Sequence, residues 1–289
     1  MGRIFLFAVG ILTVSGCDDS APFPTKDNFR LIKILNCESI TSCASPGIKK
    51  LSYDRQGNLI NEAWLESTNI VTAYTDYEYS DGKLSKKKFF GGQAGNLVLG
   101  SFINYSYSSN QLTKEELFST DGILRSTTHF EFEGDNLVST FKTDNILGIH
   151  HHVKYAYDNL SRLVLEEVFP DQKLSNFTKY YYDNSDRLIK SEFYDSAGRL
   201  TTYVEKIYSG ATAQPHEELR YDERGKLTQE KILMYDSWGQ LSDVIVNGIP
   251  IKLFDRKYKG ELLIEEIRYG RSTWNTDWTT LTRYEYETK

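Results

Sequence analysis

The stretch Tyr194-Asp195-Ser196-Ala197-Gly198-Arg199-Leu200 decides the fold, because close copies of it recur along the chain. Each copy has an aromatic residue, often an Asp, a few turn residues and then a Leu. The clearest other copies run over 53–59, 221–227 and 235–241, and looser ones over 118–124, 157–163 and 182–188. A short unit that recurs in this way is the sequence signature of a repeat architecture.

The spacing inside the unit predicts a β-hairpin with a three-residue loop. If the aromatic residue faces the Leu six positions later, the next residues inward also pair, as Asp195 with Arg199 would, and three residues remain. Such loops favour a type I turn followed by one residue in the left-handed region. Glycine adopts that conformation without a Cβ penalty. In five copies this position is glycine, namely Gly57, Gly122, Gly198, Gly225 and Gly239.

A second group of segments has the Leu five residues after the aromatic, which leaves a two-residue loop. The loop pairs are Asp81-Gly82, Ser109-Asn110, Gly134-Asp135 and Asp171-Gln172. Asp-Gly between two strands is one of the strongest short hairpin signals. Both loop lengths therefore carry the turn chemistry that hairpins require.

The runs between the turns predict one sheet. In the run from Leu188 to Tyr194 the two end residues are six apart, which places them on one face of a regular strand with Lys190 and Glu192 between them. This pattern predicts two apolar rails along the rims of one face, with a polar band between the rails. A sandwich would instead need an apolar buried face throughout. We expect an all-β protein, a long antiparallel meander of tandem hairpins in a twisted or partly coiled single sheet.

The repeated unit resembles that of the YD-repeat proteins, the family that includes the Rhs repeats. The resemblance extends from Tyr53 to Leu241, with a weaker echo at Tyr258-Lys259-Gly260. Large members build β-sheet shells around a toxin domain. We expect no such shell here, because the array is short and neither a toxin domain nor an Asp-Pro-x-Gly autoprotease signature follows it. The resemblance implies a small repeat lipoprotein and says little about function.

The N-terminus predicts export and a lipid anchor. A basic start is followed by the apolar run Ile4 to Val14, which is about half the length of a spanning helix. Val14-Ser15-Gly16-Cys17 resembles the lipobox of bacterial lipoproteins, which implies acylation of Cys17. We expect a signal peptide over 1–16 and a lipidated tether over 17–28. An ordinary signal peptide with an incidental Cys, or a buried strand, is the alternative reading.

Two further cysteines, Cys37 and Cys43, lie in a segment expected at 29–52, before the repeat domain at 53–289. In an oxidising compartment they are expected to form a disulfide around a small loop. A metal site is the rival reading, but no His lies nearby to complete a ligand set.

Composition favours a folded β protein. The 289 residues are 39% hydrophobic and 26% charged, with a net charge of −6, and 20 Tyr and 15 Phe stand against 6 Pro. Aromatic enrichment favours strands. Acidic and basic residues are interspersed without a basic block, so nucleic acid is not expected as a partner.

Candidate sites are few. His150 and His152 would share a face of a strand and could begin a metal site with Asp144 or a neighbouring strand, but an exposed polar strand is the favoured interpretation. We expect no cofactor. The repeat aromatics are interpreted as hairpin core. The repeat does not require Trp238, Trp274 and Trp278, so these are the better candidates for binding.

These observations predict a non-catalytic lipoprotein of the bacterial envelope, held in the membrane by its N-terminal lipid, with the outer membrane or the cell surface as the expected location. It would present its repeats as a binding surface for an unknown protein or glycan, since an array of similar units suits binding. An envelope hydrolase with a cleft on the sheet, or an antitoxin-type partner of a toxin, are the alternatives.

Overall fold

The computed structural model describes residues 29–37, 43, 47–66, 68–93, 95–271 and 277–288. Within those ranges the chain consists of strands joined by turns, and no helix there has the length and apolarity to cross a membrane. The expected signal peptide, the tether with Cys17, and Trp274 lie outside the described residues.

The strands follow one another at short intervals along the chain. They are β1 (Phe29–Cys37), β2 (Gly47–Tyr53), β3 (Leu59–Leu65), β4 (Val71–Ser80), β5 (Lys83–Gln93), β6 (Asn96–Ser108), β7 (Gln111–Ser119), β8 (Leu124–Glu133), β9 (Asn136–Asp144), β10 (Ile149–Tyr157), β11 (Leu163–Pro170), β12 (Asn176–Tyr182), β13 (Leu188–Asp195), β14 (Leu200–Ile207), β15 (Glu217–Asp222), β16 (Leu227–Tyr235), β17 (Leu241–Val246), β18 (Ile249–Lys252), β19 (Phe254–Lys259), β20 (Leu262–Arg271) and β21 (Asp277–Thr288).

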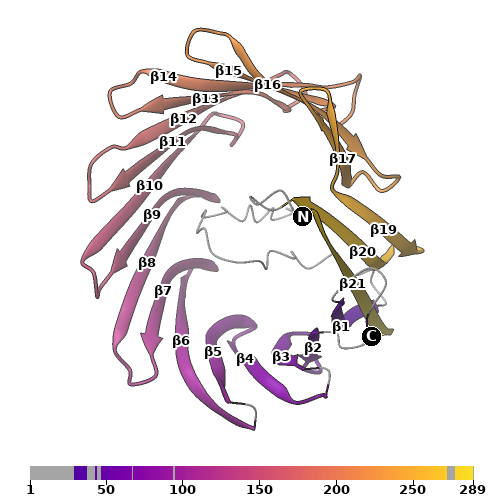
Figure 1. The fold of residues 1–289 in the computed structure, drawn as a ribbon. Helices are drawn as coiled ribbons and strands as arrows, with labels where there is room; N and C mark the ends of the chain where they lie inside the picture. Colours follow the sequence, from indigo (N-terminus) through magenta and orange to yellow (C-terminus); the bar gives the residue numbers. More distant parts are fainter. Residues whose placement is uncertain are drawn as a thin grey trace.

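All 21 strands belong to one sheet. Each strand from β1 to β17 pairs antiparallel with the next one along the chain, and β19, β20 and β21 form a second run of the same kind. β21 also pairs with β1, where Ile34 lies opposite Tyr284. The sheet therefore bends round into a nearly closed ring (Figure 1). The predicted antiparallel meander is confirmed.

One interruption remains in the ring. Only Leu253 separates β18 from β19, and among the described strands no ladder joins β19 to β17 or β18. We call this place the seam. Single backbone bonds approach it, such as the one from Leu253 N to Ser242 O at 3.0 Å.

The turns have the geometry that the sequence predicts. Asp195 N donates to Arg199 O and Gly198 N donates to Asp195 O, both at 3.0 Å, so three residues form the loop. The five predicted glycines have φ between 74° and 87°. In the two-residue loops, Asp81 and Gly82 both have positive φ, as a type I′ turn requires.

The Asp of the repeat contributes more than the charge pair that the sequence predicts. Asp195 Oδ1 accepts hydrogen bonds from Ala197 N and Arg199 N, both at 2.9 Å, and its Oδ2 accepts one from Arg199 Nε at 2.7 Å. These bonds favour the ionised carboxylate, led by the one from Arg199 N, and hold the pKa of Asp195 below its usual range. Asp158 and Asp183 hold their own turns in the same way.

Replacing Gly198 by alanine is expected to destabilise the protein by about 1 kcal/mol, because φ of 76° is costly for a residue with a Cβ. Nothing lies within 4 Å of the added Cβ, so the loss would be purely conformational. Ser161 holds the same position in another turn with φ of 60°. Ser161→Gly should therefore stabilise by a similar amount in urea unfolding, and a loss there would contradict the argument.

A β-bulge follows the Leu of the repeat hairpins. Tyr182 lies opposite Leu188, but Tyr181 lies opposite Lys190, so Ile189 is the extra residue. The same shift leaves out Ile60, Ser85, Thr113, Arg125, Val138, Val164, Thr201, Thr228, Ser242 and Ile264. An extra residue reverses the alternation of side chains beyond it.

The bulges overturn the predicted pair of rails on one face. Leu188 shares a face with Tyr182, whereas Lys190, Glu192 and Tyr194 point to the opposite face. Because the strand that follows each of these repeat hairpins carries such a shift near its start, its two ends present their Leu and aromatic residues on opposite faces. The expectation failed because it assumed regular alternation over the whole run.

Burial distinguishes the two faces. Tyr155 and Thr178 are buried, whereas Lys154 and Lys179, which point the other way from the same strands, are exposed. Side chains crowd on the concave side of a curved sheet, so we call the face of Tyr155 the inner face and that of Lys154 the outer face. The first rim, which includes hairpins 157–163 and 182–188, points its aromatics inward, and the second rim, which includes 194–200 and 221–227, points them outward.

Candidate binding surface

The inward tyrosines of the first rim are structural. Tyr182 Oη donates to the carbonyl of Leu163 in the preceding hairpin of that rim at 2.8 Å. The same bond joins other neighbouring hairpins, from Tyr79 to Leu59, Tyr157 to Leu137, Tyr208 to Leu188 and Tyr286 to Leu263. The interpretation of these residues as hairpin core accounts for their rings, but the hydrogen bond that links one hairpin to the next has no signal in the sequence.

Tyr182→Phe is expected to lower the free energy of unfolding by about 1 kcal/mol, because a partly buried carbonyl would lose its donor. Tyr221→Phe is the matched control. Its ring lies on the second rim, where it stacks on Tyr203 with centroids 4.6 Å apart, and we expect a change of a few tenths of a kcal/mol. If both variants lose the same free energy of unfolding in urea, the hydrogen bond from the Tyr182 hydroxyl does not contribute to stability.

The outward aromatics form a band along the outer face near the second rim. Rings on neighbouring strands stack there with centroids 4.3–4.9 Å apart and planes within 13° of parallel. These stacked pairs are Tyr74 with Phe90, Phe102 with Phe118, Phe177 with Tyr194 and Tyr203 with Tyr221. A fifth set consists of Phe141, His152 and Phe169 on β9, β10 and β11. We call these residues the outer aromatic band.

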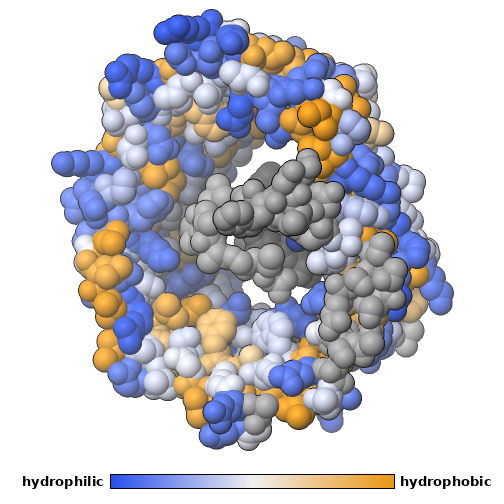
Figure 2. Space-filling model, in the orientation of Figure 1, coloured by the Kyte–Doolittle hydropathy of each residue, from blue (hydrophilic) through white to orange (hydrophobic). Residues whose placement is uncertain are grey.

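Charged side chains lie between the rings of the band. The Lys190 ammonium lies 4.5 Å from the Tyr203 centroid, and Lys86 and Lys154 lie over Phe102 and Phe169 at 5.0 and 5.3 Å. Such cation–π contacts are attractive. Hydrophilic and hydrophobic residues are correspondingly interspersed around the ring (Figure 2).

Glu192, on the outer face, accepts hydrogen bonds or an ion pair from three side chains. Burial acts to raise its pKa, but Lys190 at 2.8 Å, Tyr181 at 2.5 Å and Tyr194 at 2.7 Å all donate to it and bring the pKa down to about 2. The carboxylate is therefore ionised at neutral pH and fixed in place. Its role here is to hold the rings of the band in position.

The band is hollowed at one place into a groove of about 490 Å³. Its lining comes from β8 to β11 and the turn after β11, and consists of His129, Glu131, Ser139, Phe141, His152, Lys154, Phe169 and Gln172. His152 Nε2 lies 3.0 Å from Ser139 Oγ. Burial and then the charge of Lys154 lower the pKa of His152, so its imidazole is neutral at pH 7.

The histidine cluster is arranged as a polar strand. His150 and His152 point to one face, as the sequence predicts, and flank the ring of Phe141. His150 Nδ1 lies 3.3 Å from Thr143 Oγ1, while Asp144 accepts hydrogen bonds from two backbone amides of its own turn. Over the described ranges, no three His, Cys, Asp or Glu residues converge as metal ligands.

The tryptophan candidates are not brought together by the described part of the chain. Trp238 lies in a first-rim turn, 45% exposed, with its ring 5.0 Å from that of Tyr258 beside the seam. The backbone of Trp278 lies in β21 opposite Gly270, but its side chain, like all of Trp274, lies outside the described residues.

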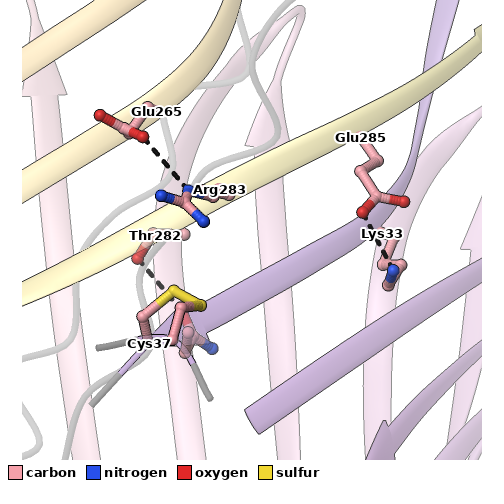
Figure 3. Close-up of a disulfide and its surroundings, with 8 residues drawn as sticks. Lys33, Cys37, Glu265, Thr282, Arg283 and Glu285 are labelled. Atoms are coloured by element: carbon pink, nitrogen blue, oxygen red, sulfur yellow. Dashed lines mark hydrogen bonds and ion pairs between the residues drawn. A yellow bond between two sulfur atoms is a disulfide. The ribbon is translucent and has the colours of Figure 1, made fainter. Parts of the chain in front are cut away.

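A disulfide joins Cys37 to Cys43, the two cysteines expected to pair. It lies at the end of β1, next to the place where β1 and β21 meet (Figure 3). Lys33 with Glu285 and Thr282 with Asn36 join these two strands by side-chain contacts of 3.0 and 3.2 Å. The disulfide therefore joins the end of β1 to Cys43, on the way to β2, while the ladder and these side-chain contacts join β1 to β21.

The fold and the band together define a class of protein, a single bulged antiparallel sheet that bends into an almost closed ring. No protein-family model matches the chain. No curated protein matches it either.

Solved structures that match this chain include a toxin complex and a porin-like protein, both at low similarity. The crystal structure of TcdB2-TccC3-TEV is 12% identical with a TM-score of 0.33, and the match covers 86% of this chain and 15% of that one. A porin-like protein from Bacteroides uniformis ATCC 8492 is 12% identical with a TM-score of 0.32, over 89% of this chain and 98% of that one. The chain thus spans about 15% of the length of the toxin structure.

Proposed function

We propose that this protein is a non-catalytic, lipid-anchored YD-repeat protein of the bacterial envelope, and that its outer aromatic band binds a protein or a glycan. The observation that carries the proposal is the repeated set of stacked rings on the outer face, three of the four pairs having a Lys ammonium over one ring. Rings and charged groups alternate along a curved surface, which supports recognition of an extended partner.

The lipid anchor has an independent test. Cys17→Ala should move the protein from the membrane fraction to the soluble fraction of fractionated cells, because the residue proposed to carry the lipid is gone. Cys43→Ala serves as the control, since it removes a cysteine outside the lipobox-like string. Retention of the Cys17→Ala protein in the membrane would refute the anchor.

The band is tested by capture from native envelope extract. The full chain should enrich a defined partner, and a variant with Phe102→Ala, Phe177→Ala and Tyr203→Ala should lose it. A control with Ile146→Ala and Leu147→Ala removes exposed apolar side chains outside the band and should retain the partner. Far-UV circular dichroism must show the same strand content in all three proteins. Equal capture by both variants would exclude the band as the binding surface.

A further inference from the structure

We propose that the groove lined by Phe141, His152 and Phe169 is a saccharide subsite that holds one uncharged sugar ring. This inference rests on the proposed binding function and names the ligand class for one part of the band. The groove has a volume of about 490 Å³, which is in the range of small-molecule sites.

The groove exists because this set of the band differs from the others. In the four stacked pairs the rings touch face to face. Here the middle member is an imidazole, its centroid is 5.7 Å from those of Phe141 and Phe169, and its plane is tilted by 82° and 37° from theirs. The imidazole is smaller than a phenyl ring and does not close the stack. Phe141 and Phe169 therefore form the apolar walls of the groove, with His150 stacked on Phe141 at 5.6 Å and the Lys154 ammonium 5.3 Å from the Phe169 centroid.

The polar lining points to the ligand class. Glu131 and Ser139 offer acceptors, and Lys154 and Gln172 offer donors, all around the same gap. The carboxylate of Glu131 offsets the ammonium of Lys154, and a single ammonium beside a carboxylate does not suit a phosphate or a polyanion. A sugar ring presents an apolar C–H face to an aromatic wall and hydroxyls to polar side chains at its edge. The groove supplies both the aromatic side chains and the polar side chains that such a ring needs.

The neighbouring ring set extends the site. Phe177 lies on β12, directly beside β11, and stacks on Tyr194 on β13 at 4.6 Å. Adjacent strands are about 4.8 Å apart, so this pair is within reach of the next sugar of a linear glycan. We expect affinity to rise with glycan length for that reason.

The test uses the full chain carrying Cys17→Ala and two uncharged probes, cellohexaose and a tetrasaccharide of N-acetylglucosamine. Titration calorimetry should show binding of at least one probe. Phe169→Ala should weaken it about tenfold, because a wall is lost. His152→Phe should abolish it by filling the gap while leaving the sheet folded. Ile251→Ala, which removes a 42% exposed side chain on β18 outside the band, is the control and should bind within about twofold of the parent.

Several outcomes would overturn the saccharide site. These outcomes are failure of the folded parent to bind either probe at 10 mM, equal binding by the parent and His152→Phe, and equal loss of binding in Phe169→Ala and Ile251→Ala. Capture of an envelope protein by the band, without saccharide binding, would overturn this inference and leave the proposed function standing. Saccharide binding without any envelope protein partner would support both.

Discussion

Arg256→Ala is expected to lower the free energy of unfolding by about 3–5 kcal/mol, the usual loss when one partner of a buried ion pair is removed. Arg256 Nε donates to Glu266 Oε2 at 2.8 Å, and the two side chains are 9% and 12% exposed. Without the guanidinium, Glu266 would keep a buried charge with its main counterion gone. The measurement is equilibrium unfolding in urea.

The position of Arg256 gives the substitution a second consequence. Arg256 lies on β19 at the seam, and its Nη1 donates at 2.8 Å to the carbonyl of Leu241, at the start of β17. Nη1 also lies 3.5 Å from Asp236 Oδ2, which accepts a bond from Tyr258 Oη. This one side chain thus bridges two strands that no ladder joins. We expect faster amide hydrogen exchange in β17 and β19 of the variant.

Arg199→Ala is the matched control, because Arg199 makes a similar contact, Nη2 to Asp195 Oδ2 at 2.7 Å, with an 80% exposed side chain. Exposed ion pairs contribute about 0–1 kcal/mol. If Arg199→Ala and Arg256→Ala cost the same, the seam does not depend on the buried pair.

The sequence was sufficient for the local structure of this protein. Loop length and glycine placement predicted the hairpins, and Gly198 and Gly225 do adopt the left-handed conformation at the bends. This succeeded because the loop geometry is decided by a few neighbouring residues. The continuous meander followed from joining such hairpins end to end.

The distribution of residues over the two faces could not be predicted, because it depends on the bulges. The residue after the Leu is Ile189 in one hairpin, Thr201 in another and Arg125 in a third, so no single residue type marks the bulge. Some of these residues do contribute locally, since Thr201 Oγ1 donates to Phe193 O at 2.9 Å. That contact is visible only once the register is known.

The groove and the ring closure were missed for a related reason. Phe141, His152 and Phe169 come together only after three strands have been paired in register, and β1 meets β21 across more than 240 positions of sequence. The histidines were recognised as sharing a face, but their aromatic neighbours lie on other strands. Contacts of such long sequence separation leave no periodic signal in the chain.

Leu263→Ala is expected to destabilise the protein by about 2–5 kcal/mol, the range for truncating a buried Leu. Leu263 is 2% exposed and packs with Ile34 and Tyr284 where β1, β20 and β21 meet. A single-layer sheet has few such places, so this cluster is where apolar burial itself closes the ring. The free energy of unfolding in urea, with thermal unfolding beside it, measures the loss.

Leu227→Ala is the control, because Leu227 holds the same position of the repeat on the second rim and is 46% exposed. A residue half in water has little burial to lose, so we expect less than about 1 kcal/mol. The repeat thus places Leu in two environments, and the copy that is buried where the ring closes contributes more to stability than the exposed copy. If both Leu variants lose the same stability, the apolar contact between the chain's two end strands contributes no more than any other hairpin, and the ring is held by its ladders alone.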